Sequence, residues 1–146
     1  MRIVLDTNVW ISALISPGGT PAQLLAQLLA PLPAPSHILL ISPEILAEIT
    51  RVLGYPKIAK RYGASEQIAQ QYIDKISRAA LFIQTASVPT ESIIAVDPSD
   101  DKFLHCAMTG DADCIVSGDR HLKDLGSHQG IPVLSPVDFL NFLASL

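Results

Sequence analysis

The sequence predicts one α/β domain, a three-layer α/β/α sandwich around a central parallel sheet of four to five strands. Short, wholly apolar runs such as residues 3–5 are typical of strands buried on both faces. Segments with apolar residues spaced three or four apart separate these runs and predict amphipathic helices. The alternation implies parallel βαβ units with helices on both faces of the sheet. A length of 146 residues, 49% hydrophobic and 16% charged, fits a single domain spanning 1–146 with a real core.

The elements follow from local signals taken in chain order. Apolar runs predict strands at 3–5, 38–41, 81–84, 114–117 and 131–134. Helices are expected from residue 20 to about 29, at 43–54, 65–78 and 100–108, and from 135 to the end. Three of these helices begin with a hydroxyl residue before a proline, the pattern of an N-cap and a first helical residue. These pairs are Thr20-Pro21, Ser42-Pro43 and Ser135-Pro136.

Composition narrows the function classes. The net charge of −4 argues against broad nonspecific binding of nucleic acid. No uncharged apolar run reaches the length of a membrane span, so no membrane partner is expected. The first strand ends in Asp6 and does not resemble a signal peptide, which makes the cytoplasm the expected location. Cys106 and Cys114 lack the spacing of a metal motif and are expected to be core thiols.

Four acidic residues lie where a parallel sheet presents its ligand-binding edge, outside the carboxyl ends of the strands. Asp6 comes directly after the first predicted strand, and Asp119 follows the fourth by two residues. Glu48 lies in the helix after the second strand. Asp100 begins the helix that leads into the fourth strand. The sequence therefore predicts that these four carboxylates gather at one edge.

Helical periodicity refines two of these positions. Glu48 lies at the edge of the apolar stripe of its helix, whereas Asp100 projects into the middle of its own stripe and Asp101 lies at the edge. A carboxylate on a buried face is costly unless it is paired or binds a metal. Taken singly, Asp6 or Asp100 could simply cap a helix, and Glu48 or Asp119 could be surface residues. Their occurrence as a set favours a shared site.

Four oxygen donors without a nearby His or Cys cluster suit Mg²⁺ or Mn²⁺. Converging carboxylates repel one another, and a bound cation reverses that effect. Such ions activate water for phosphodiester hydrolysis. RNA phosphates could then approach through a set of basic residues. These are Arg51, Lys57, Lys60, Arg61, Lys102 and Arg120.

Four segments, 5–9, 42–48, 97–103 and 116–120, resemble in order the four acidic motifs of the PIN-domain family. They look most like VapC-like bacterial and archaeal toxin components of toxin–antitoxin systems. The resemblance implies an α/β/α fold and a Mg²⁺- or Mn²⁺-dependent endoribonuclease that forms a homodimer or higher homo-oligomer and often pairs with a cognate antitoxin. It implies that Asn8 and Ser117 support Asp6 and a metal-bound water by hydrogen bonds. The third motif holds an acidic doublet, so Asp101 is an alternate ligand to Asp100. The site acids implied are Asp6, Glu48, Asp100 and Asp119.

Two other functions remain open at this point. A catalytically silent PIN-like module would bind RNA or a partner protein through the acidic pocket without turnover. A structure-specific DNA nuclease would share the chemistry, but it needs substrate-handling insertions for which a chain of 146 residues leaves little room.

Overall fold

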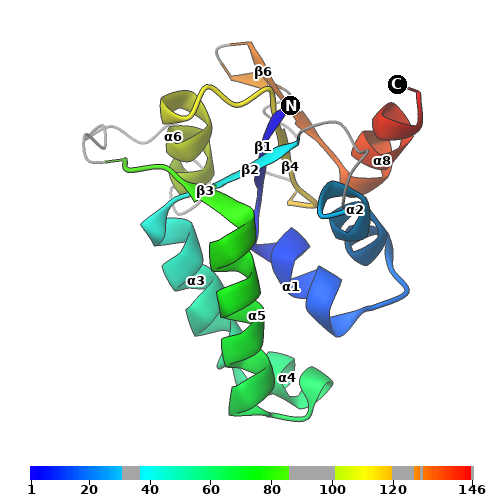
Figure 1. Cartoon of the computed structure of the whole chain (residues 1–146), viewed down its shortest axis with the longest axis vertical. Helices are drawn as coiled ribbons and strands as arrows, with labels where there is room; N and C mark the ends of the chain where they lie inside the picture. Colours follow the sequence, from blue (N-terminus) through cyan, green and yellow to red (C-terminus); the bar gives the residue numbers. More distant parts are fainter. Residues whose placement is uncertain (31–36, 86–100, 120–126, 129, 146) are drawn as a thin grey trace.

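The computed structural model of the chain describes residues 1–30, 37–85, 101–119, 127–128 and 130–145. A six-stranded sheet runs through the middle of the molecule in the order β3-β2-β1-β4-β6-β5 (Figure 1). All neighbouring pairs are parallel except β5 with β6. The strands are β1 (Arg2–Leu5), β2 (Ile38–Ile41), β3 (Ala80–Phe82), β4 (Cys114–Val116), β5 (Ser127–His128) and β6 (Ile131–Leu134).

Helices cover both faces of this sheet. Helix α6 packs against β1, β2 and β4, while α2 packs on α8. Figure 1 shows α6 on one side of the strands and α1, α2 and α8 on the other, which makes the sheet the middle of three layers. The helices are α1 (Thr7–Ile15), α2 (Thr20–Leu28), α3 (Pro43–Leu53), α4 (Pro56–Ala59), α5 (Glu66–Ala79), α6 (Asp101–Thr109) and α8 (Pro136–Ala144). The predicted α/β/α architecture is confirmed.

Local capping explains where several helices begin. Ser42, Ser65 and Ser135 each accept a hydrogen bond from a backbone amide in the first turn of α3, α5 and α8, at 3.3, 3.1 and 3.1 Å respectively. The N-cap of α2 is Gly19 instead of the expected Thr20, which is the first helical residue. The structure therefore confirms that these serines begin their helices, and it places the N-cap of α2 one residue earlier than expected.

Four described elements were missing from the sequence prediction. Helix α1 was not predicted, because its sequence is largely apolar and its few polar residues give only a weak amphipathic pattern. Helix α4 and the 3-10 helix η1 (Lys60–Tyr62) are too short to show a periodicity. Strand β5 has only two residues. In addition, β3 begins at residue 80 and ends at 82, so the prediction of 81–84 was shifted.

The core lies between the sheet and its helices. Ile3, Val4 and Leu5 in the central strand are at most 1% exposed, as expected for a parallel strand covered on both faces. Cys106 and Cys114 are free and buried, which confirms the expected core thiols. None of the helices in the described ranges combines the length and apolar character that crossing a bilayer requires.

Candidate active site

Asp6 lies at the carboxyl end of the central strand, where β1 gives way directly to α1. Its backbone N–H donates to the carbonyl of Val116 at 3.0 Å and so extends the pairing of β1 with β4. Its carboxylate is the N-cap of α1 and accepts from the amide of Val9 at 2.9 Å. With only 2% of its surface exposed, Asp6 is a buried acid fixed by a strand on one side and a helix on the other.

Ser117 connects Asp6 to the next strand. The serine follows β4, is fully buried, and donates its hydroxyl proton to Oδ2 of Asp6. The same hydroxyl oxygen accepts from the backbone N–H of Asp119 at 2.8 Å. Two of the predicted acids, together with the predicted supporting serine, therefore belong to one hydrogen-bonded unit across β1 and β4.

Burial raises the pKa of Asp6 above its ordinary value of 3.8. The hydrogen bonds from Ser117 and from the amides of Val9 and Asn8 act in the opposite direction, because they favour the ionised form. The nearby negative charge of Asp119 raises the pKa further. Asn8 thus contributes through its backbone amide, and its side chain is exposed. The unit stabilises a carboxylate in a place where burial and a second acid both oppose its charge.

Glu48 lies beside this unit, in α3. Its Oε1 accepts from the hydroxyl of Thr7, the buried residue that follows Asp6. Its Oε2 is 2.7 Å from Nζ of Lys102 and 3.7 Å from Nη2 of Arg51. Thr7 was not among the predicted site residues, although its place next to Asp6 was a usable signal. Through Thr7, the position of Glu48 depends on the same strand-to-helix junction as Asp6.

The third acidic motif is only partly described. Asp100 lies outside the described residues, so its predicted role stays a prediction. Asp101 is the first residue of α6 and is 7% exposed, although the helical pattern had placed it at the edge of the apolar stripe. The structure thus adds burial to the case for the alternate acid.

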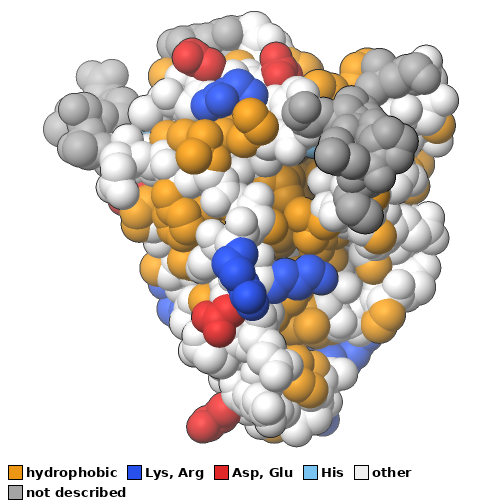
Figure 2. Space-filling model, in the orientation of Figure 1, with side chains coloured by type: hydrophobic (Ala, Val, Ile, Leu, Met, Phe, Trp, Pro, Cys, Tyr) orange, Lys and Arg blue, Asp and Glu red, His pale blue; other side chains and the backbone are white. Residues whose placement is uncertain are grey.

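The basic residues predicted to meet RNA do not form one group in the described structure. Lys102 and Arg51 both contact Glu48. Lys57, Lys60 and Arg61 lie beyond the far end of α3, in α4 and η1, where Arg61 donates to the carbonyl of Ile15 at 3.2 Å. On the face drawn in Figure 2, Lys and Arg side chains lie singly or in small groups among apolar and neutral ones. Arg120 lies outside the described residues.

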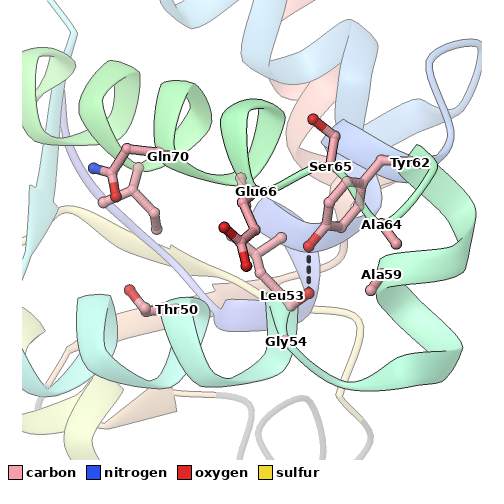
Figure 3. A pocket seen from close by; sticks show the side chains of 11 residues that line it. Thr50, Leu53, Gly54, Ala59, Tyr62, Ala64, Ser65, Glu66 and Gln70 are labelled. Carbon is pink, nitrogen blue, oxygen red and sulfur yellow. Dashed lines mark hydrogen bonds between the residues drawn. The ribbon is translucent and has the colours of Figure 1, made fainter.

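A cavity of about 330 Å³ opens between α3, η1 and α5, at the distal end of α3 (Figure 3). The hydroxyl of Tyr62 crosses it to donate to the carbonyl of Leu53, and Thr50 and Glu66 also line it. None of the predicted acids that the structure describes lines it. The candidate site is therefore the edge where β1 and β4 end, and the cavity is a separate feature.

The acidic side chains at this edge are the donors available to the expected Mg²⁺ or Mn²⁺ ion. Within the part of the chain that the structure describes, no three His, Cys, Asp or Glu side chains are grouped closely enough to hold an ion. The buried Asp6 carboxylate beside Asp119 is nevertheless a site where a positive charge relieves both burial and repulsion. Carboxylate oxygens are the ligands that Mg²⁺ and Mn²⁺ prefer. The oxygen donors present are therefore of the kind that such a cation binds.

Comparisons with known proteins agree with the architecture. Residues 2–121 match the family model of the PIN domain. An uncharacterized protein of Methanocaldococcus jannaschii is 31% identical over 150 residues, covering 96% of this chain and 90% of that protein. A chain in the crystal structure of VapBC2 from Rickettsia felis bound to a DNA fragment from their promoter superposes with a TM-score of 0.59. That match covers 92% of this chain and 98% of the other at 14% identity, so it supports the shared fold.

Proposed function

The chain belongs to the PIN domain family, and on that premise we propose that it is a Mg²⁺- or Mn²⁺-dependent endoribonuclease. The proposed reaction is hydrolysis of RNA phosphodiester bonds. The observation that carries the proposal is the buried Asp6 carboxylate, joined through Ser117 to Asp119 where two parallel strands end. Members of this family are generally nucleases, and this arrangement provides what such chemistry needs at the expected edge of the sheet.

Asp6 and Asp119 are the acids proposed to hold the cation, with Glu48 beside them. The third motif would add Asp100 or Asp101. When bound, such a cation activates water and stabilises the charge that develops on phosphate oxygens.

The chain's own residues supply orientation and charge. Ser117 holds Asp6 and the backbone of Asp119 in a fixed relation, because its hydroxyl is bonded to both. Thr7 holds one oxygen of Glu48 and so ties α3 to the strand end. We propose that Arg51, which lies 3.7 Å from Glu48 with 61% of its side chain exposed, binds an RNA phosphate next to the acids.

We further propose that the chain is the toxin component of a type II toxin–antitoxin pair and acts as a homodimer or higher homo-oligomer. The fold match to a VapBC2 structure supports a cognate antitoxin as the partner. The test is co-purification with the product of the neighbouring reading frame and the mass of the isolated chain in solution.

A second candidate is the catalytically silent module that binds RNA or a protein. The ion pair between Lys102 and Glu48 favours it, since that pair neutralises one of the expected metal-binding acids within the protein itself. The two candidates differ in turnover, because the silent module binds RNA without cleaving it in either metal.

The deciding experiment incubates a mixed RNA pool and a matched DNA pool with the protein in Mg²⁺, Mn²⁺ or EDTA, and maps new ends by sequencing. Asp6→Asn should reduce cleavage by about a hundredfold or more, because it removes a charged ligand. Asparagine keeps one acceptor oxygen for the amide of Val9 and is a good N-cap, so α1 should persist, and an unchanged circular dichroism spectrum would show that the fold is retained. Glu66→Gln, the same change at an exposed acid of α5, should cleave like the wild type.

RNA cleavage that is lost in EDTA and in Asp6→Asn supports the proposal. Equal cleavage by Asp6→Asn would refute the site. Binding without new ends would favour the silent module, and ends confined to the DNA pool would identify a DNA nuclease.

A further inference from the structure

Lys102 carries a positive charge at a place where a helix disfavours one. It is the second residue of α6, and the first turn of a helix presents partial positive charge from its free amides. Its side chain is only 18% exposed, and its ammonium lies 5.0 Å from the centre of the Phe103 ring. A half-buried lysine at a helix start therefore needs compensation from an acid.

Glu48 provides that compensation. The ammonium of Lys102 lies 2.7 Å from Oε2 of Glu48, whose side chain is equally shielded at 18% exposure. The other oxygen of Glu48 accepts from Thr7. Arg51 also faces Oε2, but at 3.7 Å and with 61% of its side chain exposed, so water screens it far more. Lys102 is thus the principal internal cation on this carboxylate.

We propose that Lys102 is a built-in counter-ion of Glu48 that a divalent cation displaces when it binds at the acidic edge. This inference rests on the proposed function, because it takes Glu48 as part of the metal site. An ammonium and a divalent cation repel one another, and both would be held by the carboxylate of Glu48. Binding of the metal and pairing with Lys102 therefore oppose each other, and the opposition is reciprocal.

The chemistry of lysine suits this exchange. Its charge is a compact ammonium on a flexible four-carbon stem, so it can leave one acceptor while the stem keeps its packing. An arginine holds a carboxylate through a planar fork and is less easily released. In the metal-bound protein the freed ammonium would stay near the acids, where it would form an ion pair with an RNA phosphate.

The test is the affinity for Mn²⁺, measured by titration calorimetry without RNA, so that the readout does not depend on cleavage. Lys102→Met should bind Mn²⁺ about tenfold more tightly than the wild type, a size typical of coupling between two binding events. Lys102→Arg should bind no more tightly than the wild type. Lys75→Met, which removes the same charge from an exposed position in α5, should change the affinity by less than about twofold.

A double-mutant cycle identifies the carboxylate through which Lys102 acts. In the Glu48→Gln background the acceptor charge is gone, so Lys102→Met should no longer tighten Mn²⁺ binding. Thermal melting supplies a second readout. Lys102→Met should melt lower in EDTA, because it leaves a half-buried carboxylate without its cation, and should gain more from Mn²⁺ than the wild type does.

The outcomes separate this inference from the proposed function. If the wild type binds Mn²⁺ and Lys102→Met binds it equally or more weakly, the counter-ion role is wrong and the metal site stands. If the tightening persists in the Glu48→Gln background, Lys102 does not act through Glu48, and the inference is refuted. If the wild type binds neither Mn²⁺ nor Mg²⁺, both the inference and the proposed function fail.

Discussion

Replacing Ser117 by alanine tests how strongly the hydrogen bonds around Asp6 hold the candidate site together. The hydroxyl donates to the Asp6 carboxylate and accepts from the amide of Asp119 at 2.8 Å, in a position without solvent exposure. A hydrogen bond to a charged group contributes about 1.5–3 kcal/mol, and a neutral one contributes about 1 kcal/mol. Ser117→Ala should therefore lower the free energy of unfolding by about 3 kcal/mol at neutral pH in EDTA.

The pH dependence of this loss has a definite sign. The bond from Ser117 favours the ionised form of Asp6 and lowers the pKa of that carboxyl, while burial raises it. Its contribution is therefore present above the pKa of Asp6 and fades as the pH falls through that pKa, which lies above 3.8. The loss in free energy of unfolding caused by Ser117→Ala should become smaller as the pH is lowered from neutral toward the pKa of Asp6.

Urea unfolding of both proteins across this pH range measures the effect. The matched control is Ser135→Ala, which removes one hydrogen bond at the more exposed cap of α8 and should cost about 1 kcal/mol. A Ser117→Ala deficit no larger than that of the control would refute the reasoning, as would a deficit that grows toward acid pH.

Two further predictions concern the core. Burial raises the pKa of both Cys106 and Cys114 to about 12, so at pH 8 only about one thiol in 10⁴ is ionised. Because the thiolate is the reactive form, Ellman's reagent should leave both unmodified in the folded protein and titrate both in guanidinium; fast native labelling would contradict this. Ile45→Ala, at a site with no exposure, should cost about 2–5 kcal/mol in urea unfolding, against less than about 1 kcal/mol for Ile68→Ala at 39% exposure. Similar losses in the two variants would show that α3 is not packed as described.

The features that were predicted correctly are those whose signals lie within a few consecutive residues. The strand at 38–41 could be recognised because its residues are apolar without interruption, and the start of α3 because Ser42 precedes a proline. The placement of Asp6 after a strand followed from the same local signal. These signals are local, although the strand at 38–41 itself forms only by pairing with β1 and β3.

The features that were missed depend on distant partners. Helix α1 has only a weak amphipathic pattern, and burial of Val9, Trp10 and Ile11 favours a helix there. The partners of Glu48 lie 41 positions before it and 54 positions after it, on other elements, so no spacing rule could pair Thr7 or Lys102 with Glu48. Helical periodicity favoured Asp100 over its neighbour, and the burial of Asp101 shows why a doublet cannot be resolved that way.

The pairing of β1 with a strand that is far away along the chain also sets when the candidate site can form during synthesis. Asp6 is synthesised before Ser117, its partner across the strand ends, which follows 111 positions later. A ribosome making about 5–20 residues per second needs roughly 5–20 s to cover that interval. Throughout it Asp6 cannot meet Ser117 or Asp119, so the hydrogen-bonded unit across β1 and β4 is not yet formed. Chains that stop before Ser117 lack this hydrogen-bonded unit, so the proposed cleavage would require synthesis to have passed that residue.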